Sequence, residues 1–347
     1  MTATGDQAIQ PRRASPRRSL RTRLMTRVLQ IAAAKVTRLS PQNARARLDS
    51  LARLAPPGLG VTRRRARVGG VPGEWIVPRG WRDGLTFLHF HGGGYALCSA
   101  LTHRLMVSDI ARATGARGLA VEHRLAPEHP YPAAIEDCVA AYRGVLGQGV
   151  PWRKLFLTGD SAGAALAIEV MVRAREDGLP LPLAAVLMSP WADLECRGAT
   201  MESNAPYDYL SAGVVRSFAG FYLAGHDPRD RRVSPVHADL TGLPRTLIQA
   251  GGAEVFLADI VRLKEKAESD GVDVTFQCWD GMVHAFQGFT LFLPEARVAM
   301  AAIGDFVRTV GAEDATARLG GGGETEGRTP SAAPPLPLPP PLRPRDP

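Results

Sequence analysis

Between residues 85 and 310, short apolar runs alternate with longer segments of helical periodicity. Runs of consecutive apolar residues predict strands that are buried on both faces of a sheet. Helical segments between such strands are typical of βαβ units, so we expect an α/β fold with a mostly parallel central sheet flanked by helices. The expected strands are 85–90, 118–123, 155–159, 184–189, 246–251 and 274–279, and the expected helices include 105–115, 133–146 and 258–271.

This alternation is interrupted once, by an insertion at about 195–241 that has helical periodicity but no strand. An insertion of this length usually forms a lid rather than a loose loop. Residues 19–55 predict one or two further amphipathic helices. We expect both segments to form a helical cap over the carboxyl ends of the strands, where α/β sheets bind ligands. The apolar positions of the first helix are Leu20, Leu24, Val28 and Leu29.

The two ends of the chain differ in composition from its body. Residues 1–18 are rich in arginine and proline, and residues 311–347 are rich in glycine and proline, so we expect both to be disordered. The remaining chain divides into 19–70, with the cap helices and a linker, and 71–310, the α/β domain with its insertion. We find no internal repeat.

Charge is distributed unevenly along the chain. The first 70 residues hold 16 Lys+Arg and 2 Asp+Glu, whereas the other 277 hold 26 and 32, a net charge of −6. The acidic body argues against a nucleic-acid-binding protein. The basic head is either a solvated surface or a contact for an anionic one. No apolar run approaches the roughly 18 residues of a membrane span, so we expect no stable membrane insertion.

The four cysteines are far apart and form no metal-binding spacing, which argues against a zinc site and a disulfide framework. Free thiols favour a reducing compartment, and we expect a cytoplasmic protein. The pair Arg17 and Arg18 invites a targeting interpretation, but the longest uncharged stretch that follows, 28–34, is too short for a signal peptide.

The strongest chemical motif is GDSAG at residues 159–163, which follows the run LFLT and precedes the helical segment AALAIEVMVRARE. In a strand, G-x-S-x-G, helix context, a sharp turn lifts the serine off the end of its strand. Small neighbours at Gly159 and Gly163 let strand and helix pack closely. The Ser161 hydroxyl then projects at a helix N-terminus, whose dipole favours developing negative charge.

A serine nucleophile needs a base and an acid that orients the base. The chain supplies both in the order serine, acid, histidine. Glu254 follows the expected strand 246–251, and His284 follows the last expected strand. Asp259 competes with Glu254 as the acid, but it falls inside the next expected helix. We favour Glu254 and keep Asp259 as the alternative.

A second motif, HGGG at residues 91–94, follows the expected strand 85–90. Three glycines in a row are costly in backbone entropy, so a plain tight turn competes with a chemical interpretation. An acyl transfer forms an oxyanion that needs backbone N–H donors from two loops. One donor follows the nucleophile at Ala162, and a bare backbone at HGGG provides the other.

These motifs resemble the hormone-sensitive lipase family of α/β-hydrolase esterases, as do EHRLAPEHPYPAAIED at 122–137 and GMVHAFQGF around His284. The resemblance covers about residues 70–310. It implies an α/β-hydrolase fold and a serine esterase that needs no metal and no organic cofactor. It assigns Ser161 as nucleophile, His284 as base, Glu254 as acid, Gly93, Gly94 and Ala162 as the oxyanion hole, and His91, Gly92 and Asp160 as supporting residues.

Three positions depart from the family pattern. Glu122 and His123 stand where the family often has Asp and Tyr, and Ala258 replaces an acidic residue. None of them belongs to the proposed catalytic residues, so the departures bear on local packing.

The resemblance predicts a carboxylesterase for short- to medium-chain acyl esters, with an acyl pocket lined by Leu210, Phe218 and Tyr222. The substrate is a small molecule, and a homodimer is one possible assembly. Hydrolysis of amides, carbamates or acetylated sugars or antibiotics is the first alternative, because the triad does not select the leaving group. A non-catalytic small-molecule receptor is a weaker alternative, since His284 is present. An interaction role for the termini could accompany catalysis.

Overall fold

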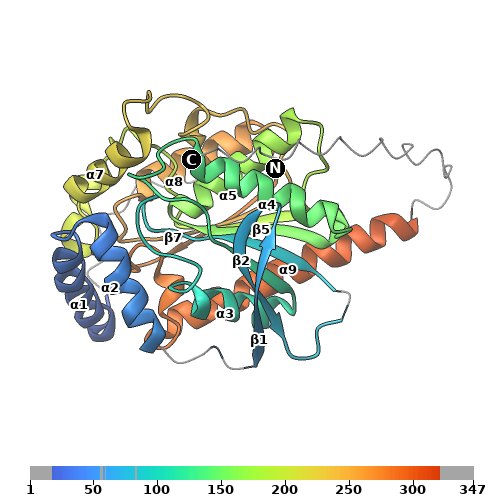
Figure 1. Cartoon of the computed structure of the whole chain (residues 1–347), viewed down its shortest axis with the longest axis horizontal. Helices are drawn as coiled ribbons and strands as arrows, with labels where there is room; N and C mark the ends of the chain where they lie inside the picture. Colours follow the sequence, from blue (N-terminus) through green and yellow to red (C-terminus); the bar gives the residue numbers. More distant parts are fainter. Residues whose placement is uncertain (1–17, 55–57, 59, 83, 321–347) are drawn as a thin grey trace, which may run out of the picture.

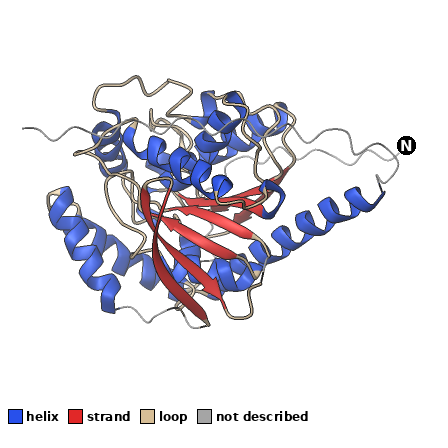
Figure 2. Cartoon of the chain, turned by 45° about the vertical axis from the view of Figure 1, so that its right-hand side comes forward, coloured by secondary structure: helices blue, strands red, loops and turns tan. Residues whose placement is uncertain are grey.

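The computed structural model describes residues 18–54, 58, 60–82 and 84–320, which form one eight-stranded sheet with helices on both sides (Figures 1 and 2). The strand order is β1-β2-β4-β3-β5-β6-β7-β8. The first two strands run antiparallel to their neighbours, and every other neighbouring pair is parallel. The strands are β1 (Val61–Val68), β2 (Val71–Pro78), β3 (Thr86–Phe90), β4 (Arg117–Val121), β5 (Leu155–Asp160), β6 (Ala184–Met188), β7 (Thr246–Gly251) and β8 (Val274–Trp279).

All six expected strands are confirmed, as β3 to β8, and the fold class is the expected one. The sequence analysis missed β1 and β2. Strand β1, VTRRRARV, is largely exposed at the edge of the sheet, so it lacks the apolar run that marks a buried strand. The expected linker within 19–70 is therefore wrong over 61–68, because these residues pair with β2.

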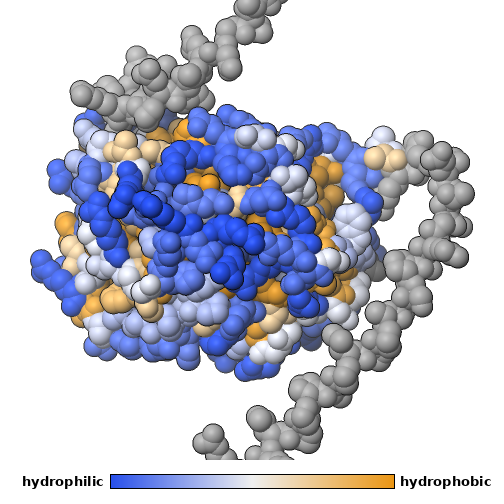
Figure 3. Space-filling model, turned by 90° about the horizontal axis from the view of Figure 1, so that it is seen from above, coloured by the Kyte–Doolittle hydropathy of each residue, from blue (hydrophilic) through white to orange (hydrophobic). Residues whose placement is uncertain are grey.

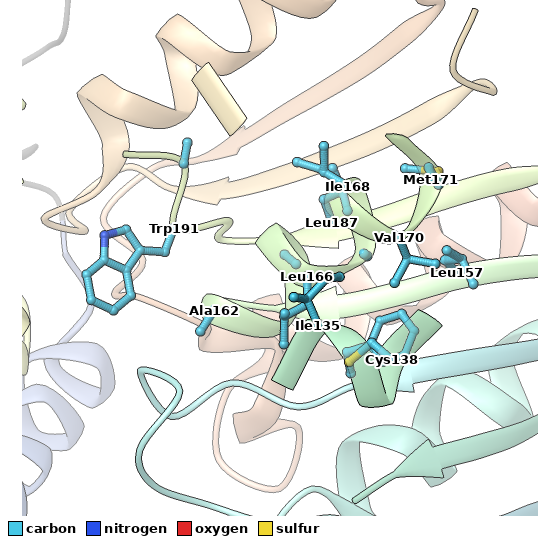
Figure 4. Packing of buried hydrophobic residues seen from close by; sticks show 14 of the residues in the cluster. Ile135, Cys138, Leu157, Ala162, Leu166, Ile168, Val170, Met171, Leu187 and Trp191 are labelled. Carbon is cyan, nitrogen blue, oxygen red and sulfur yellow. The ribbon is translucent and has the colours of Figure 1, made fainter. Parts of the chain in front are cut away.

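The helices cover the sheet in two layers. Helices α3 (Arg104–Thr114) and α9 (Pro294–Gly320) pack together on one face. Helices α4 (Ala133–Gly147), α5 (Ala162–Glu176) and α8 (Leu257–Ser269) cover the other. Figure 4 shows the packing around α5, which buries side chains against β5, β6 and α4. The labelled residues include Leu166 and Val170 of α5, Leu157 of β5, Leu187 of β6, and Ile135 and Cys138 of α4.

The C-terminal boundary of the ordered chain differs from the prediction. We expected order to fail beyond about residue 311, but α9 continues to Gly320. Val307 and Val310 of this helix are buried in the core beneath it, and Glu313 and Asp314 pair with Arg245 and Arg153. Burial and ion pairing therefore stabilise the last turns of α9, although the local composition after residue 311 predicted a disordered tail. Residues 1–17 and 321–347, which we expected to be disordered, lie outside the described residues.

Three helices lie beside one another at one side of the molecule and form what we call the cap: α1 (Leu20–Val36), α2 (Pro41–Leu54) and α7 (Ala212–Leu223) (Figure 1). The short helix α6 (Thr200–Ser203) precedes α7 in the insertion. Short 3-10 helices lie at Trp152–Lys154, Ala205–Tyr207, Pro235–His237 and Phe286–Phe289.

The orientation of α1 differs from what its apolar spacing suggests. Leu29 and Met25 pack on the body of the protein, but Leu20, Leu24 and Val28 face solvent. The inner face instead buries Thr22 and Thr26, and the Thr26 hydroxyl donates to the Thr22 carbonyl at 2.7 Å. No helix among the described residues is long and apolar enough to cross a membrane.

Candidate active site

Ser161 lies at the junction of β5 and α5, in a backbone conformation that side chains rarely adopt, with φ 54° and ψ −122°. The surrounding backbone holds this turn. The N–H of Ser161 donates to the Met188 carbonyl at 2.9 Å, and its carbonyl accepts from the N–H of Trp191 at 3.0 Å. A positive φ at a non-glycine residue is costly and persists only where the surrounding structure enforces it. The turn presents Ser161 at the start of α5, as the motif predicts.

The two glycines of GDSAG permit this close junction. A Cβ at Gly163 would overlap the carbonyl oxygen of Phe90 and lie 2.7 Å from that of His91. A Cβ at Gly159 would overlap the carbonyl of Gly163 and lie 2.7 Å from the Ala164 nitrogen. Both positions therefore need a residue without a side chain for α5 to start directly beside β3 and β5.

His284 and Glu254 form a buried pair. The Nδ1–H of His284 donates to Glu254 Oε2 at 2.7 Å, and the side chains are 3% and 0% exposed. The other carboxylate oxygen of Glu254 accepts from the Gly251 N–H at 2.8 Å. Burial alone lowers the pKa of His284, but the hydrogen bond and charge of Glu254 outweigh it and leave that pKa raised. The carboxylate thus orients the imidazole and stabilises its protonated form.

Asp259, the alternative acid, lies in α8 and pairs with Arg262 at 3.0 Å. It is fully buried, and burial raises its pKa to about 6. Among the described residues, its recorded ionic partner is this arginine, whereas Glu254 contacts the imidazole directly. The geometry therefore favours Glu254, as the position of the residue at the strand exit suggests.

The glycine loop after β3 lies beside Ser161. Gly93 and Gly94 have φ of 108° and 62° and line the same cavity as Ser161 and His284. Ala162 is the first residue of α5, so its N–H has no acceptor within the helix. Backbone N–H groups at these three positions are the kind of donor that an oxyanion in this cavity would need.

A buried carboxylate ties this loop to the serine turn. The N–H of Gly92 donates to Asp160 Oδ1 at 3.1 Å, and His103 Nε2 lies 3.3 Å from the same carboxylate. Burial alone raises the pKa of Asp160, but the neighbouring histidines outweigh it and hold that pKa well below its usual range. The Nδ1–H of His91 donates to the Gly92 carbonyl at 2.8 Å. Asp160, His91 and Gly92 therefore position the loop.

Sequence reasoning missed Asp208, which lies in the insertion and contacts both loops that carry Glu254 and His284. Its carboxylate accepts from the N–H of Val255 at 2.9 Å and of His284 at 3.2 Å. The N–H of Tyr209 is a third donor, at 2.7 Å. Burial raises the pKa of Asp208 to about 6. No local motif marks this aspartate, because its partners come from segments 47 and 76 residues further along the chain.

The three departures from the family pattern have local partners. Glu122 accepts from the N–H of Ala100 at 2.8 Å, and the ring of His123 stacks on that of His91 with centroids 4.2 Å apart. The N–H of Ala258 donates to the Thr200 hydroxyl at 2.9 Å. His123 supports the glycine loop, and the other two hold neighbouring segments.

A cavity of about 450 Å³ opens above Ser161 and His284. Its walls are mostly apolar and come from the cap as well as from the strand ends. Leu210 and Phe218 line it, as predicted, together with Ala33, Val36, Leu48, Val214, Val215, Trp191, Phe256 and Phe289. Tyr222 does not. It stacks on Tyr95 with ring centroids 3.7 Å apart and belongs to the buried core, so its assignment to the pocket is wrong.

One group of described side chains, Asp193, Glu195 and His237, could bring potential metal ligands within 4.8 Å of one another. Arginines already neutralise these carboxylates. Arg262 contacts Asp193 at 2.7 Å, and Arg229 contacts Glu195 at 2.9 Å. The group does not line the cavity above Ser161. We therefore interpret this group as an ion-pair network rather than as a cation site.

Comparisons with known proteins agree with this geometry. A family model described as the alpha/beta hydrolase fold matches residues 87–288, so the chain belongs to that family. An acetyl-hydrolase from Streptomyces hygroscopicus is 46% identical over 259 residues, which cover 74% of this chain and 85% of that protein. An esterase from Acinetobacter venetianus is 38% identical over 274 residues, 78% and 90% of the two chains.

Solved structures narrow the class further. An esterase of the bacterial hormone-sensitive lipase family superposes with a TM-score of 0.80 at 41% identity, over 84% of this chain and 98% of that one. The esterase EstE5 superposes with a TM-score of 0.79 at 36% identity, over 85% of this chain and 100% of the EstE5 chain. The resemblance seen in the sequence is confirmed: the protein is a carboxylic ester hydrolase of the hormone-sensitive lipase group.

Proposed function

We propose that the protein is a serine carboxylesterase that hydrolyses short- to medium-chain acyl esters through a Ser161–His284–Glu254 triad. The observation that carries this proposal is the 2.7 Å hydrogen bond between Glu254 and His284 beside the cavity that Ser161 lines. It gives the histidine a fixed tautomer, with Nε2 left to act as the base.

The reaction has two acyl-transfer steps. Ser161 Oγ bonds to the ester carbonyl carbon while His284 Nε2 takes the hydroxyl proton, and the carbonyl π pair moves onto oxygen. The amides of Gly93, Gly94 and Ala162 hold that oxyanion. The carbon–oxygen bond to the alcohol then breaks, and the alcohol leaves with the proton from His284. Water repeats the sequence on the acyl-enzyme and releases the acid.

The preference for short and medium acyl chains is supported by the size of the cavity. A volume of about 450 Å³ with apolar walls suits a small ester. EstE5, whose structure was determined after soaking with p-nitrophenyl butyrate, is a similar protein. Removal of acetyl groups is the second candidate, because the Streptomyces relative carries the name acetyl-hydrolase.

Hydrolysis of p-nitrophenyl esters from acetate to laurate tests the proposal. We expect a maximum at short or medium chains in the wild type, and Ser161→Ala should lose at least about a thousandfold in kcat. Glu254→Gln should lose on the order of a hundredfold or more, because the imidazolium loses its counter-charge. If only the acetate ester were hydrolysed efficiently, the result would favour removal of acetyl groups, the second candidate activity.

Asp259→Asn is the matched control, because it also neutralises a buried carboxylate of that region. Its kcat should stay within about threefold of the wild type, since Asp259 contacts Arg262 rather than His284. If Asp259→Asn lost activity and Glu254→Gln kept it, the assignment of the acid would be reversed.

We also propose a cytoplasmic location. The four cysteines, Cys98, Cys138, Cys196 and Cys278, are all free thiols, as is usual in a reducing compartment. Fractionation of the producing cell into cytoplasm, membrane and medium, followed by immunodetection, tests this.

A further inference from the structure

The outward face of α1 carries a stripe of large apolar side chains. Leu20, Leu24, Val28 and Ile31 are 81%, 65%, 57% and 59% exposed, at the spacing of successive helical turns. We call these four residues the α1 stripe. Single exposed apolar residues are common on proteins, but an aligned row along one helix marks an interaction surface. Figure 3 shows one face of the molecule, on which hydrophobic patches lie among hydrophilic residues.

The stripe is not the face by which α1 packs on the protein. Met25 and Leu29 hold the helix against the cluster around Phe286, and Ala33 and Val36 line the active-site cavity. The stripe lies on the opposite side of the helix. Helix α1 is therefore apolar on two sides, and only the inner side is covered within the described residues.

Basic residues border the stripe. At roughly 100° per residue, Arg21 falls beside one edge of the stripe and Arg27 beside the other. Both are exposed, and no ion pair is recorded for either among the described residues. The first 70 residues contain 16 Lys+Arg against 2 Asp+Glu, so the wider surroundings of α1 are strongly positive in sequence.

We propose that the α1 stripe is an adsorption face for an anionic lipid surface. An apolar row flanked by arginines suits the boundary between headgroups and acyl chains, where leucines enter the apolar layer and guanidinium groups meet phosphate. A second copy of the chain fits less well, because it would bring the basic residues of a second α1, which has four Lys+Arg and no acidic residue, against those of the first. The contact is peripheral and reversible, and no helix in the described part of the chain could span the bilayer.

Adsorption through the α1 stripe would bring the lipid surface close to the cap that covers the active-site cavity. The stripe and the cavity-lining residues Ala33 and Val36 lie on the same helix, so a lipid surface bound there would lie beside the cap rather than at the far end of the sheet. The adsorption itself does not depend on the proposed triad, because vesicle binding is measured without any reaction.

Co-sedimentation of the full chain with vesicles tests the proposal. The vesicles contain phosphatidylcholine alone or with about 30 mol% phosphatidylglycerol, at low and at physiological ionic strength. We expect partitioning to be at least about tenfold stronger on the anionic vesicles and to weaken as salt is added. Equal binding to both kinds of vesicle, or none to either, would overturn the proposal.

Three double variants locate the contact. Leu24→Ser with Val28→Ser should lower binding about tenfold or more, because two apolar side chains no longer enter the lipid. Arg21→Gln with Arg27→Gln should lower it several-fold. Arg63→Gln with Arg65→Gln is the matched control, since it removes the same charge from the exposed edge strand β1. An equal loss in the control would show attraction to the whole protein and overturn the proposal.

Two further readouts keep the result interpretable. Hydrolysis of a soluble p-nitrophenyl ester should be unchanged in Leu24→Ser with Val28→Ser, because neither residue lines the cavity. Analytical ultracentrifugation of the same variant should match the wild type. If the wild type were a dimer and this variant a monomer, the stripe would be an interface between copies and not a lipid contact.

Discussion

The fate of three buried carboxylates depends on their neighbours. Glu254, Asp259 and Asp208 are all almost fully buried. Glu254 bonds to an imidazole, Asp259 to a guanidinium, and Asp208 to backbone N–H groups of the loops that carry Glu254 and His284. Asp208 does not reach the reacting atoms, so it is a positioning residue. Its negative charge also stabilises the protonated form of His284.

Replacing Asp208 tests this role through the pH profile. In the proposed mechanism His284 must be neutral to act as a base. Its pKa is raised, so wild-type kcat/KM should fall as the pH drops through a value above the usual one of about 6.5. In Asp208→Asn the lost charge lowers that pKa, so the fall should move to lower pH. We expect kcat to drop about tenfold, because one amide hydrogen would face an N–H donor.

Asp259→Asn again serves as the control, and its pH midpoint should match the wild type. If Asp208→Asn reduced only the melting temperature and left the midpoint in place, Asp208 would have a purely structural role.

At the scale of elements, the site depends on how closely β5, β3 and α5 meet. The helix starts directly where the strand ends, and the contact between Gly163 and the end of β3 leaves no room for a methyl group. The glycines thus set the position of Ser161 relative to the loop that carries Gly93 and Gly94.

Gly163→Ala should therefore destabilise the protein by at least about 2 kcal/mol, because its Cβ overlaps backbone that cannot rotate away. Activity should fall at least about tenfold in the folded fraction, since the serine shifts from the oxyanion donors. Chemical denaturation and p-nitrophenyl ester hydrolysis measure the two effects.

Gly220→Ala in α7 is the control for Gly163→Ala, because an added Cβ at Gly220 meets nothing within 4 Å. It should stabilise the protein by up to about 1 kcal/mol through its helical propensity. Equal destabilisation by both variants would show that packing at the junction of β5 and α5 is not the cause.

At the scale of the whole molecule, the last helix, α9, covers the hydrophobic core on the face of the sheet that it shares with α3. Val307 and Val310 of α9 pack with Ile110 and Val107 of α3, so a segment near the end of the chain covers one face of the sheet. Arg153 and Arg245, which lie just before β5 and β7, pair with Asp314 and Glu313 of this helix.

A chain that ends at Gly320 should unfold with the same free energy as the full chain within about 0.5 kcal/mol, because the Gly- and Pro-rich composition of 321–347 predicts no packed core. A chain that ends at Asp305 loses two buried valines and should be less stable by about 3 kcal/mol or more. Urea denaturation of the two chains measures the difference. Equal stability would show that the end of α9 does not contribute to the core.

The sequence determined the elements whose signals are local. Apolar runs located β3 to β7 because a buried strand needs apolar residues on both faces, and a shorter run located the half-exposed edge strand β8. GDSAG and HGGG located the serine turn and the glycine loop because only particular residues permit those backbones. Edge strand β1 gave no such signal, since an exposed arginine-rich strand is held by its partner rather than by its own composition.

Only the tertiary structure decided which distant residues meet and which side of a helix is covered. Asp208 reaches the histidine loop from 76 residues away, and Tyr222 turns from the pocket into the core. The spacing of Leu20, Leu24 and Val28 predicts a helix, but periodicity gives the faces of a helix and not their partners. Which face is buried depends on the surface that the rest of the chain presents, and here that surface takes Met25 and Leu29 and leaves the other row in solvent.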